Sequence, residues 1–136
     1  MRHYLNIVKA LACDKRLRIL MALSHGELCE GALAELAGIR PATAWRHLWV
    51  LANAGLVDSE KYGRCVCYHL AIAREGSLVQ AALNWVRGCL CGDPQMIQDA
   101  TRLTTLAVRT PVPTLRRLRH GKNKMKSEGS LCGSSV

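Results

Sequence analysis

The residues with the most evident chemistry in this 136-residue chain are seven cysteines: Cys13, Cys29, Cys65, Cys67, Cys89, Cys91 and Cys132. An odd number of cysteines and an N-terminus without a secretory apolar region argue against a disulfide framework. Both features favour free thiols that bind a metal or undergo redox chemistry. Thiolates are soft ligands, so the ions expected at such a site are thiophilic.

Two of these cysteines stand at the end of a predicted helix, in the order Cys89-Leu90-Cys91. Residues two apart inside an α-helix point about 200° away from each other, so their sulfurs converge only where the helix ends first. Gly88 before the pair and Gly92 after it predict that ending. The sequence therefore predicts that these two thiols can share one ion.

A second set of residues has the chemistry of DNA recognition. Pro41 suits the first turn of a helix that Gly55 ends, and Ala44, Leu48 and Leu51 form its buried stripe. The opposite face is basic and rich in hydrogen-bonding groups, which the major groove of DNA accepts. The candidate DNA contacts are Arg40, Thr43, Trp45, Arg46, His47, Trp49 and Asn53, together with Arg64 in the turn that follows.

Several of these DNA contacts have alternative interpretations. The indoles of Trp45 and Trp49 either touch thymine methyls or the sugar–phosphate wall, or they pack on a neighbouring helix. His47 lies beside the buried stripe and is either structural or a phosphate contact. Arg64 either reaches phosphate or the minor groove, or is a solvated turn residue.

The elements that must position these residues follow from apolar spacing and turn signals. We expect a mainly α fold with a small β-hairpin, a winged helix-turn-helix in the order α-α-α-α-β-β-α whose terminal helices form a dimer. The wide apolar stripe of the last helix is typical of a dimer interface, and a buried core helix has the same pattern. The first 92 residues would form the DNA-binding and dimerisation domain, and residues 93–136 a weakly helical extension and then a basic disordered tail. The predicted helices cover 4–11, 15–23, 31–36, 41–53 and 75–88, and the strands cover 56–61 and 65–71.

Cys65 and Cys67 form a second candidate pair, on the second strand of the hairpin. Side chains alternate along a strand, so the two thiols share one face while Val66, Tyr68 and Leu70 face the core. A ligand on this pair would touch the hairpin directly. The alternative is that both cysteines only fill positions often held by larger residues.

The net charge of +9 indicates an anionic partner, and it is unevenly distributed. Residues 109–136 hold 7 of the 19 Lys/Arg and only one of the 10 Asp/Glu, so most of the excess belongs to the tail. No apolar run approaches the ~18 residues that a membrane span needs. We therefore expect a cytoplasmic protein with a nucleic-acid partner and no membrane contact.

Five stretches of the sequence carry a family resemblance: 11–20 (LACDKRLRIL), 26–29 (GELC), 46–48 (RHL), 51–57 (LANAGLV) and 63–70 (GRCVCYHL). With the order of the predicted elements, they make residues 3–92 resemble the ArsR/SmtB family of winged-helix metal-sensing repressors. The resemblance implies a homodimer on double-stranded, palindromic operator DNA, which an inducer releases.

The resemblance also implies an inducer. Family members with cysteines at the end of the last helix sense trivalent arsenic or antimony through three sulfurs, or another soft metal ion. Residues 76–92 contain no His, Asp or Glu, which disfavours zinc-like ions. Another branch of the family binds its ion with the two thiolates of a Glu-Leu-Cys-x-Cys motif. Here Cys29 matches the first thiolate, but Gly31 stands where the second would be, so only part of that site is present. Beside Cys89 and Cys91, the third ligand would come from Cys29, from Cys13 across the dimer or from Cys132.

The predicted function is a repressor of a metalloid resistance operon. It would leave its DNA when an arsenic- or antimony-type inducer binds its cysteine thiolates. The alternative input is thiol oxidation or persulfide formation in the same fold. An enzyme is not expected, because no phosphate loop, no acidic pair and no redox Cys-x-x-Cys after a strand is present. A basic protein-interaction module that never meets DNA is the remaining alternative.

Overall fold

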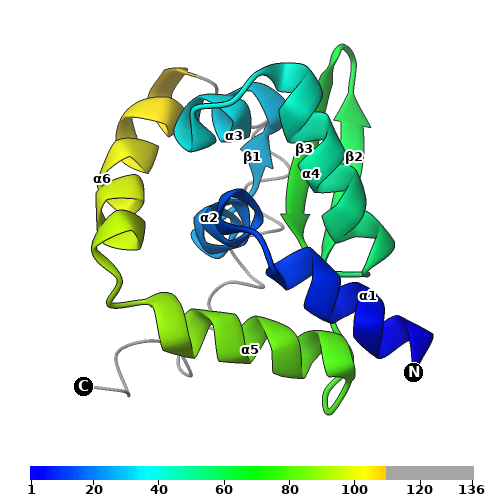
Figure 1. Cartoon of the computed structure of the whole chain (residues 1–136). Coiled ribbons are helices and arrows are strands. Elements are labelled where there is room, and N and C mark those ends of the chain that lie inside the picture. Colours follow the sequence, from blue (N-terminus) through cyan, green and yellow to red (C-terminus); the bar gives the residue numbers. More distant parts are fainter. Residues whose placement is uncertain (110–136) are drawn as a thin grey trace.

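The computed structural model describes residues 1–109. This part of the chain forms six helices and three short strands (Figure 1). In order, they are α1 (Arg2–Leu11), α2 (Asp14–Leu23), β1 (Leu28–Cys29), α3 (Glu30–Ala37), α4 (Pro41–Asn53), β2 (Val57–Tyr62), β3 (Cys65–Leu70), α5 (Leu78–Leu90) and α6 (Pro94–Arg109). The expected mainly α fold with a β-hairpin is confirmed.

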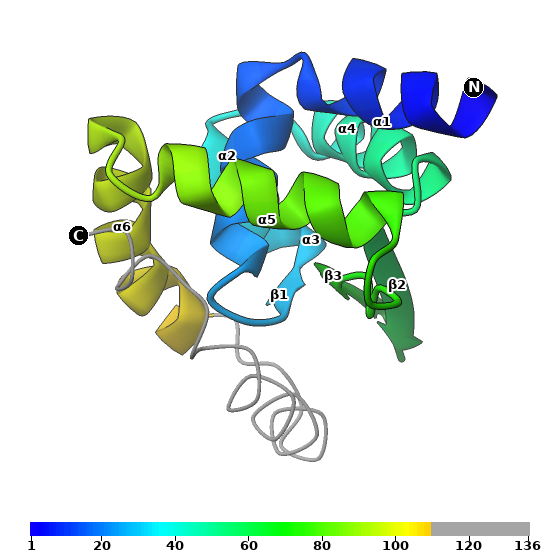
Figure 2. The same cartoon turned by 90° about the horizontal axis from the view of Figure 1, so that it is seen from below.

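Helix α2 lies at the centre, and the other helices surround it (Figure 1). Ile19, Leu20 and Leu23 of α2 are almost fully buried. They join Leu33 and Leu36 of α3, and Leu48 and Leu51 of α4, in one apolar cluster. Viewed from below, α5 runs across α2 (Figure 2). The helix-turn-helix and the sheet are therefore fixed to a common core.

Helix α4 has the bounds that the sequence predicts. Pro41 occupies its first turn, and the Ala44 amide donates to the Arg40 carbonyl at 2.9 Å. Leu48 and Leu51 are 0% exposed, as the apolar spacing requires. Gly38, at φ +67°, ends α3 three residues earlier. This tight connection sets α4 beside α3.

Strands β2 and β3 form the predicted hairpin, with Tyr62 opposite Cys65 and Val57 opposite Leu70. Gly63 takes φ +60° at the first central position of the two-residue turn, a conformation that suits glycine. Strand β1 was not predicted, because two residues carry no alternation pattern. It exists through pairing with β3, which becomes the central strand of the sheet.

Helix α5 differs from its prediction at both ends. It begins at Leu78 rather than at residue 75, because Ser77 caps it by accepting a hydrogen bond from the Gln80 amide at 3.2 Å. It continues through Gly88 to Leu90, so the prediction that Gly88 ends the helix is wrong. Gly88 does not take a positive φ, and a glycine without one does not stop a helix.

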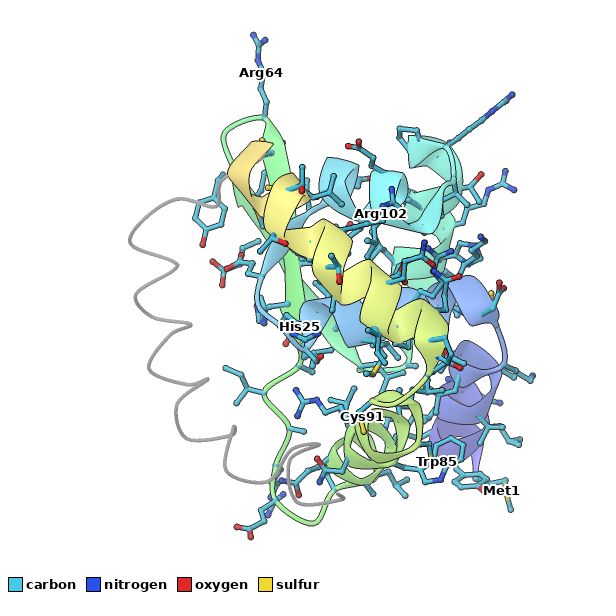
Figure 3. The ribbon with its side chains drawn as sticks, turned by 90° about the vertical axis from the view of Figure 1, so that its left-hand side faces the viewer. Met1, His25, Arg64, Trp85, Cys91 and Arg102 are labelled. Atoms are coloured by element: carbon cyan, nitrogen blue, oxygen red, sulfur yellow. The ribbon has the colours of Figure 1, made fainter. Side chains whose placement is uncertain are left out.

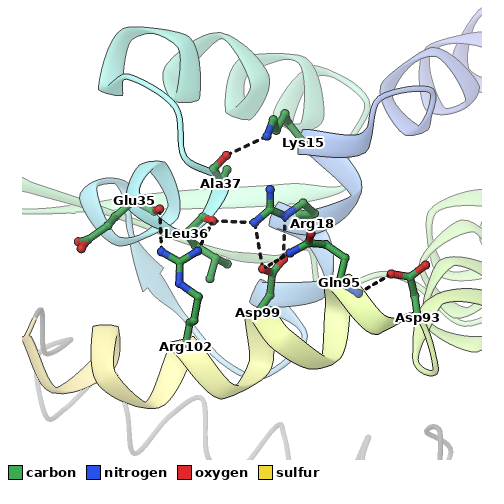
Figure 4. A network of polar contacts seen from close by, with 9 residues as sticks. All are labelled: Lys15, Arg18, Glu35, Leu36, Ala37, Asp93, Gln95, Asp99 and Arg102. Atoms are coloured by element: carbon green, nitrogen blue, oxygen red, sulfur yellow. Dashed lines mark hydrogen bonds and ion pairs between the residues drawn. The ribbon is translucent and has the colours of Figure 1, made fainter.

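Helix α6 packs against α2 and α3 on the side opposite the hairpin (Figure 1). Leu103 and Leu106 belong to the same apolar cluster as the preceding helices. Arg102 donates to the Leu36 and Glu35 carbonyls at 3.2 and 3.4 Å (Figure 4). No helix within residues 1–109 is long and apolar enough to cross a membrane.

Candidate nucleic-acid interface and cysteine sites

The outer face of α4 is open to solvent. The polar candidates Arg40, Thr43, Arg46 and Asn53 are all exposed. Trp45 and Trp49 keep 53% and 54% of their surface exposed, so the chain's own helices do not bury them. The buried stripe anchors this helix from behind. The combination leaves a fixed helix whose polar and aromatic face is free to meet another molecule.

His47 differs from the other candidates because it contacts the chain itself. Its Nδ1 lies 3.3 Å from Nη1 of Arg16, and Arg16 also donates to the Ala10 carbonyl at 2.7 Å. Burial lowers the pKa of His47 below its ordinary value, and the charge of Arg16 lowers it further. A neutral ring can accept the hydrogen bond from Arg16 through Nδ1. His47 thus links α4 to α2.

Arg64 lies at the tip of the hairpin and points away from the rest of the molecule (Figure 3). It is exposed, as is the neighbouring Cys65. A cation at the end of a projecting hairpin is placed to reach a phosphate beside the groove that α4 would occupy.

The two cysteines of α5 do not converge as expected. Cys89 lies inside the helix and is exposed, whereas Cys91 is its C-cap, with helical backbone angles. Because the helix continues, the two side chains leave its axis about 200° apart. The Cys91 thiol is 3.8 Å from the Gly88 carbonyl, to which it donates. An ion held by both sulfurs would require the last turn of α5 to unwind.

The candidates for a third sulfur are dispersed. Cys13 is the N-cap of α2 and is partly exposed, and Cys29 is buried at the end of β1. Cys132 lies outside the described residues. No cluster of three or more His, Cys, Asp or Glu suited to a metal occurs within residues 1–109.

The structure instead brings together Cys29 and Cys67, whose Sγ atoms are 3.1 Å apart. Cys67 is 0% exposed, and burial raises the pKa of its thiol to about 12, with the contact to Cys29 adding to the effect. Cys65 is exposed but Cys67 is buried, so the expectation that both thiols lie on the face turned away from the core is wrong for Cys67. Strand β1 pairs with β3 beside Cys67, and helix α3 also contacts β3. The sequence signal for β1, two apolar residues before a helix, was too short to use.

The fold combines a helix-turn-helix, an exposed polar face on α4 and a projecting hairpin. These features define the class of winged helix-turn-helix DNA-binding proteins. Within that class, the family profile described as "Bacterial regulatory protein, arsR family" matches residues 13–59. The chain belongs to the arsR family. This family comprises DNA-binding regulators rather than enzymes.

Two curated relatives have similar sequences. The chain is 33% identical over 75 residues to the biofilm growth-associated repressor of Agrobacterium fabrum, which covers 55% of this chain and 64% of that protein. It is 38% identical over 77 residues to the cadmium resistance transcriptional regulatory protein CadC homolog of Staphylococcus aureus, and this match covers 56% of this chain and 64% of that protein. The chain thus spans somewhat less than two thirds of these relatives.

Several solved structures are similar to this chain over about two thirds or more of its length. HlyU from Vibrio cholerae has a TM-score of 0.57 and 28% identity, over 66% of this chain and 94% of that one. The homodimeric winged helix-turn-helix domain of a possible ArsR-family regulator from Mycobacterium bovis has a TM-score of 0.54 and 27% sequence identity, over 74% of this chain and 82% of that one. The antimony-specific transcriptional repressor AntR has a TM-score of 0.52 and 28% sequence identity, over 71% of this chain and 78% of that one.

Proposed function

We propose that this protein is a homodimeric transcriptional repressor that binds operator DNA and is released when a thiophilic inducer binds its cysteine thiolates. The observation that carries the DNA-binding part is the solvent-exposed polar face of α4 on a helix whose opposite stripe is fully buried. In this proposal α4 enters the major groove and the hairpin tip touches the flanking backbone.

The proposed DNA interface divides into two kinds of contact. Arg46 and Asn53 project from α4 and have the donors that read base edges in the major groove. Arg40 before the helix and Arg64 on the hairpin supply charge for phosphates, which fixes orientation without reading sequence. Binding through these cations would weaken steeply as salt concentration rises.

The proposed dimer interface is an apolar surface shared by α1 and α5, which contact each other. Tyr4 and Val8 of α1 are 53% and 45% exposed, and Leu78 and Trp85 of α5 are 47% and 63% exposed. Met1 and Trp85 lie at the same end of the molecule (Figure 3). Large apolar side chains grouped on two adjacent helices favour a self-complementary interface, and the relative from Mycobacterium bovis is described as homodimeric.

The proposed inducer is trivalent arsenic or antimony, or another soft metal ion, bound at Cys89 and Cys91. Two relatives support this class of ligand by their names, since one concerns cadmium and the other antimony. Cys89 lies in the helix that carries the proposed dimer surface, and Cys91 is its C-cap. Unwinding its last turn around an ion would alter the pairing of the subunits and hence the spacing of the two α4 helices.

The third sulfur in this proposal is Cys13 from across the dimer, because Cys13 is partly exposed at the start of α2 whereas Cys29 already contacts Cys67. Cys132 remains an alternative. A coupling free energy of about 1–3 kcal/mol would weaken operator binding roughly 5–150-fold. Such a change is sufficient for a transcriptional switch. The protein would act in the cytoplasm, where thiols stay reduced.

A thiol-redox or persulfide input is the second candidate function. The observation that favours it is the 3.1 Å approach of two cysteine sulfurs within the DNA-binding module. Mass spectrometry of the full chain after arsenite and after peroxide separates the inputs. Arsenic adducts on Cys89 and Cys91 would support the metalloid function, whereas oxidation without adducts would support the redox function.

The deciding experiment measures operator release by fluorescence anisotropy, using DNA from upstream of the protein's own gene. Arsenite, antimonite and cadmium are titrated against the wild type, Cys89→Ser and Cys91→Ser. Cys65→Ser is the matched control, because Cys65 is also exposed but lies on the hairpin. We expect only the two α5 variants to lose release. Full release from both variants would contradict the proposed inducer site but not the DNA-binding function.

A further inference from the structure

Cys29 and Cys67 lie directly opposite each other in the antiparallel pair of β1 and β3. Their Sγ atoms are 3.1 Å apart, and neither cysteine is in a disulfide. Cys29 is 8% exposed and Cys67 is 0% exposed. The two thiols therefore face each other inside the protein, shielded from most other partners.

The backbone at this position suits a covalent bond. Directly opposed residues of antiparallel strands hold their Cα atoms about 4.5–5.5 Å apart. A disulfide needs Cα atoms about 4.4–6.8 Å apart and sulfurs about 2.05 Å apart. The sulfurs must thus approach by roughly 1 Å, a movement that side-chain rotation supplies without a change of strand register.

We propose that Cys29 and Cys67 form a cross-strand disulfide when the protein meets a peroxide. Cys29, which retains some exposure, attacks hydrogen peroxide: an S–O bond forms, the O–O bond breaks, and one water leaves. The Cys67 sulfur then attacks the Cys29 sulfenic acid: the S–S bond forms, the S–O bond breaks, and the leaving hydroxide takes the Cys67 proton as a second water. Two thiols are oxidised and one peroxide is reduced.

The position of this bond gives it a consequence for the DNA-binding module. Cys29 is the N-cap of α3, and Cys67 is in the central strand of the sheet. They are 38 positions apart, and the closed loop contains α3, α4 and β2. Oxidation would therefore tie the start of the helix-turn-helix to the hairpin. It would raise the Tm by several degrees, because a loop of this length loses freedom in the unfolded chain.

The bond would form independently of the α5 cysteines, so the proposal does not rest on the metalloid function. The double variant Cys89→Ser/Cys91→Ser should form it as the wild type does. This separates the site from any oxidation at the end of α5.

The test uses the full chain, treated with hydrogen peroxide, denatured in iodoacetamide and digested with trypsin without reductant. Cys29 falls in peptide 19–46, since Arg40 precedes Pro41, and Cys67 falls in peptide 65–74 with Cys65. We expect a cross-linked pair two hydrogen masses lighter than the separate peptides, which dithiothreitol separates. Fragmentation assigns the sulfur within peptide 65–74.

Two variants sharpen the assignment. Cys65→Ser should keep the cross-link and Cys67→Ala should abolish it, together with the rise in Tm on oxidation. The wild-type experiment stands alone if the buried substitution prevents folding. Recovery of Cys29 and Cys67 fully alkylated, at peroxide concentrations that oxidise the exposed Cys65 or Cys89, would overturn the proposal.

Discussion

Arg18 of α2 and Asp99 of α6 form a two-point ion pair, with Nε to Oδ2 at 2.8 Å and Nη2 to Oδ1 at 2.9 Å (Figure 4). Their side chains are only 12% and 4% exposed. Nη2 of Arg18 also donates to the Leu36 carbonyl at 2.8 Å. One guanidinium therefore joins the central helix, the end of α3 and the helix that follows the winged domain.

Asp99→Ala should destabilise the fold by about 3 kcal/mol, because it leaves the Arg18 charge in a largely buried site without its counter-ion. Urea unfolding followed by circular dichroism measures the change. Asp58→Ala is the control, since Asp58 is exposed on β2, and it should change the free energy of unfolding by less than about 0.5 kcal/mol. Equal losses of unfolding free energy in the two variants would contradict a stabilising role for the ion pair.

His47 should make the free energy of unfolding depend on pH below neutrality. The pKa of His47 is lowered in the fold, by burial and by Arg16, so the unfolded chain takes up a proton before the folded one. Stability should therefore fall as the pH drops through the ordinary histidine range towards the lower folded pKa. His47→Gln should flatten this part of the profile, measured by urea unfolding at several pH values. An unchanged slope in the variant would contradict the account.

Arg46→Ala should weaken operator binding by about 1–3 kcal/mol and relax sequence preference if Arg46 reads a base edge. A phosphate contact would instead weaken binding to all sequences and reduce the salt slope by about one. Anisotropy titrations at several salt concentrations distinguish these roles. Arg74→Ala is the control, because Arg74 is exposed beyond the end of β3 opposite the hairpin tip and should change neither quantity.

Trp85→Glu should convert the proposed dimer to a monomer, because it places a charge in the apolar surface of α1 and α5. Sedimentation equilibrium measures the association constant. Ile72→Glu is the matched control, since Ile72 is a large apolar residue with 79% exposure outside those two helices. Dimers of unchanged affinity in Trp85→Glu would place the interface elsewhere.

Gly88→Ala should stabilise the protein by about 0.5–1 kcal/mol, because alanine is the better residue inside a continuing helix. A Cβ at Gly88 would meet no atom within 4 Å. Gly38→Ala should do the opposite, since Gly38 has φ +67°. Thermal unfolding at one protein concentration compares the two. Destabilisation by Gly88→Ala would favour the helix ending that the sequence suggested.

The sequence alone determined the elements whose signals are local. The bounds of α4 follow from Pro41 at its first turn and the 3.6-residue spacing of Ala44, Leu48 and Leu51. The hairpin follows from Gly63 between two strands. The exposed face of α4, and hence the DNA-binding class, was predictable because helix periodicity decides which side is buried.

Tertiary structure decided the features that depend on residues far apart in the chain. Strand β1 forms by pairing with β3, and that pairing brings Cys29 to Cys67. The continuation of α5 through Gly88 separated the Cys89 and Cys91 side chains that the sequence had placed together. Arg18 and Asp99, 81 positions apart, anchor α6 to the core. Such contacts leave no periodic signal, because their free energy comes from burial and pairing that exist only once the chain has folded.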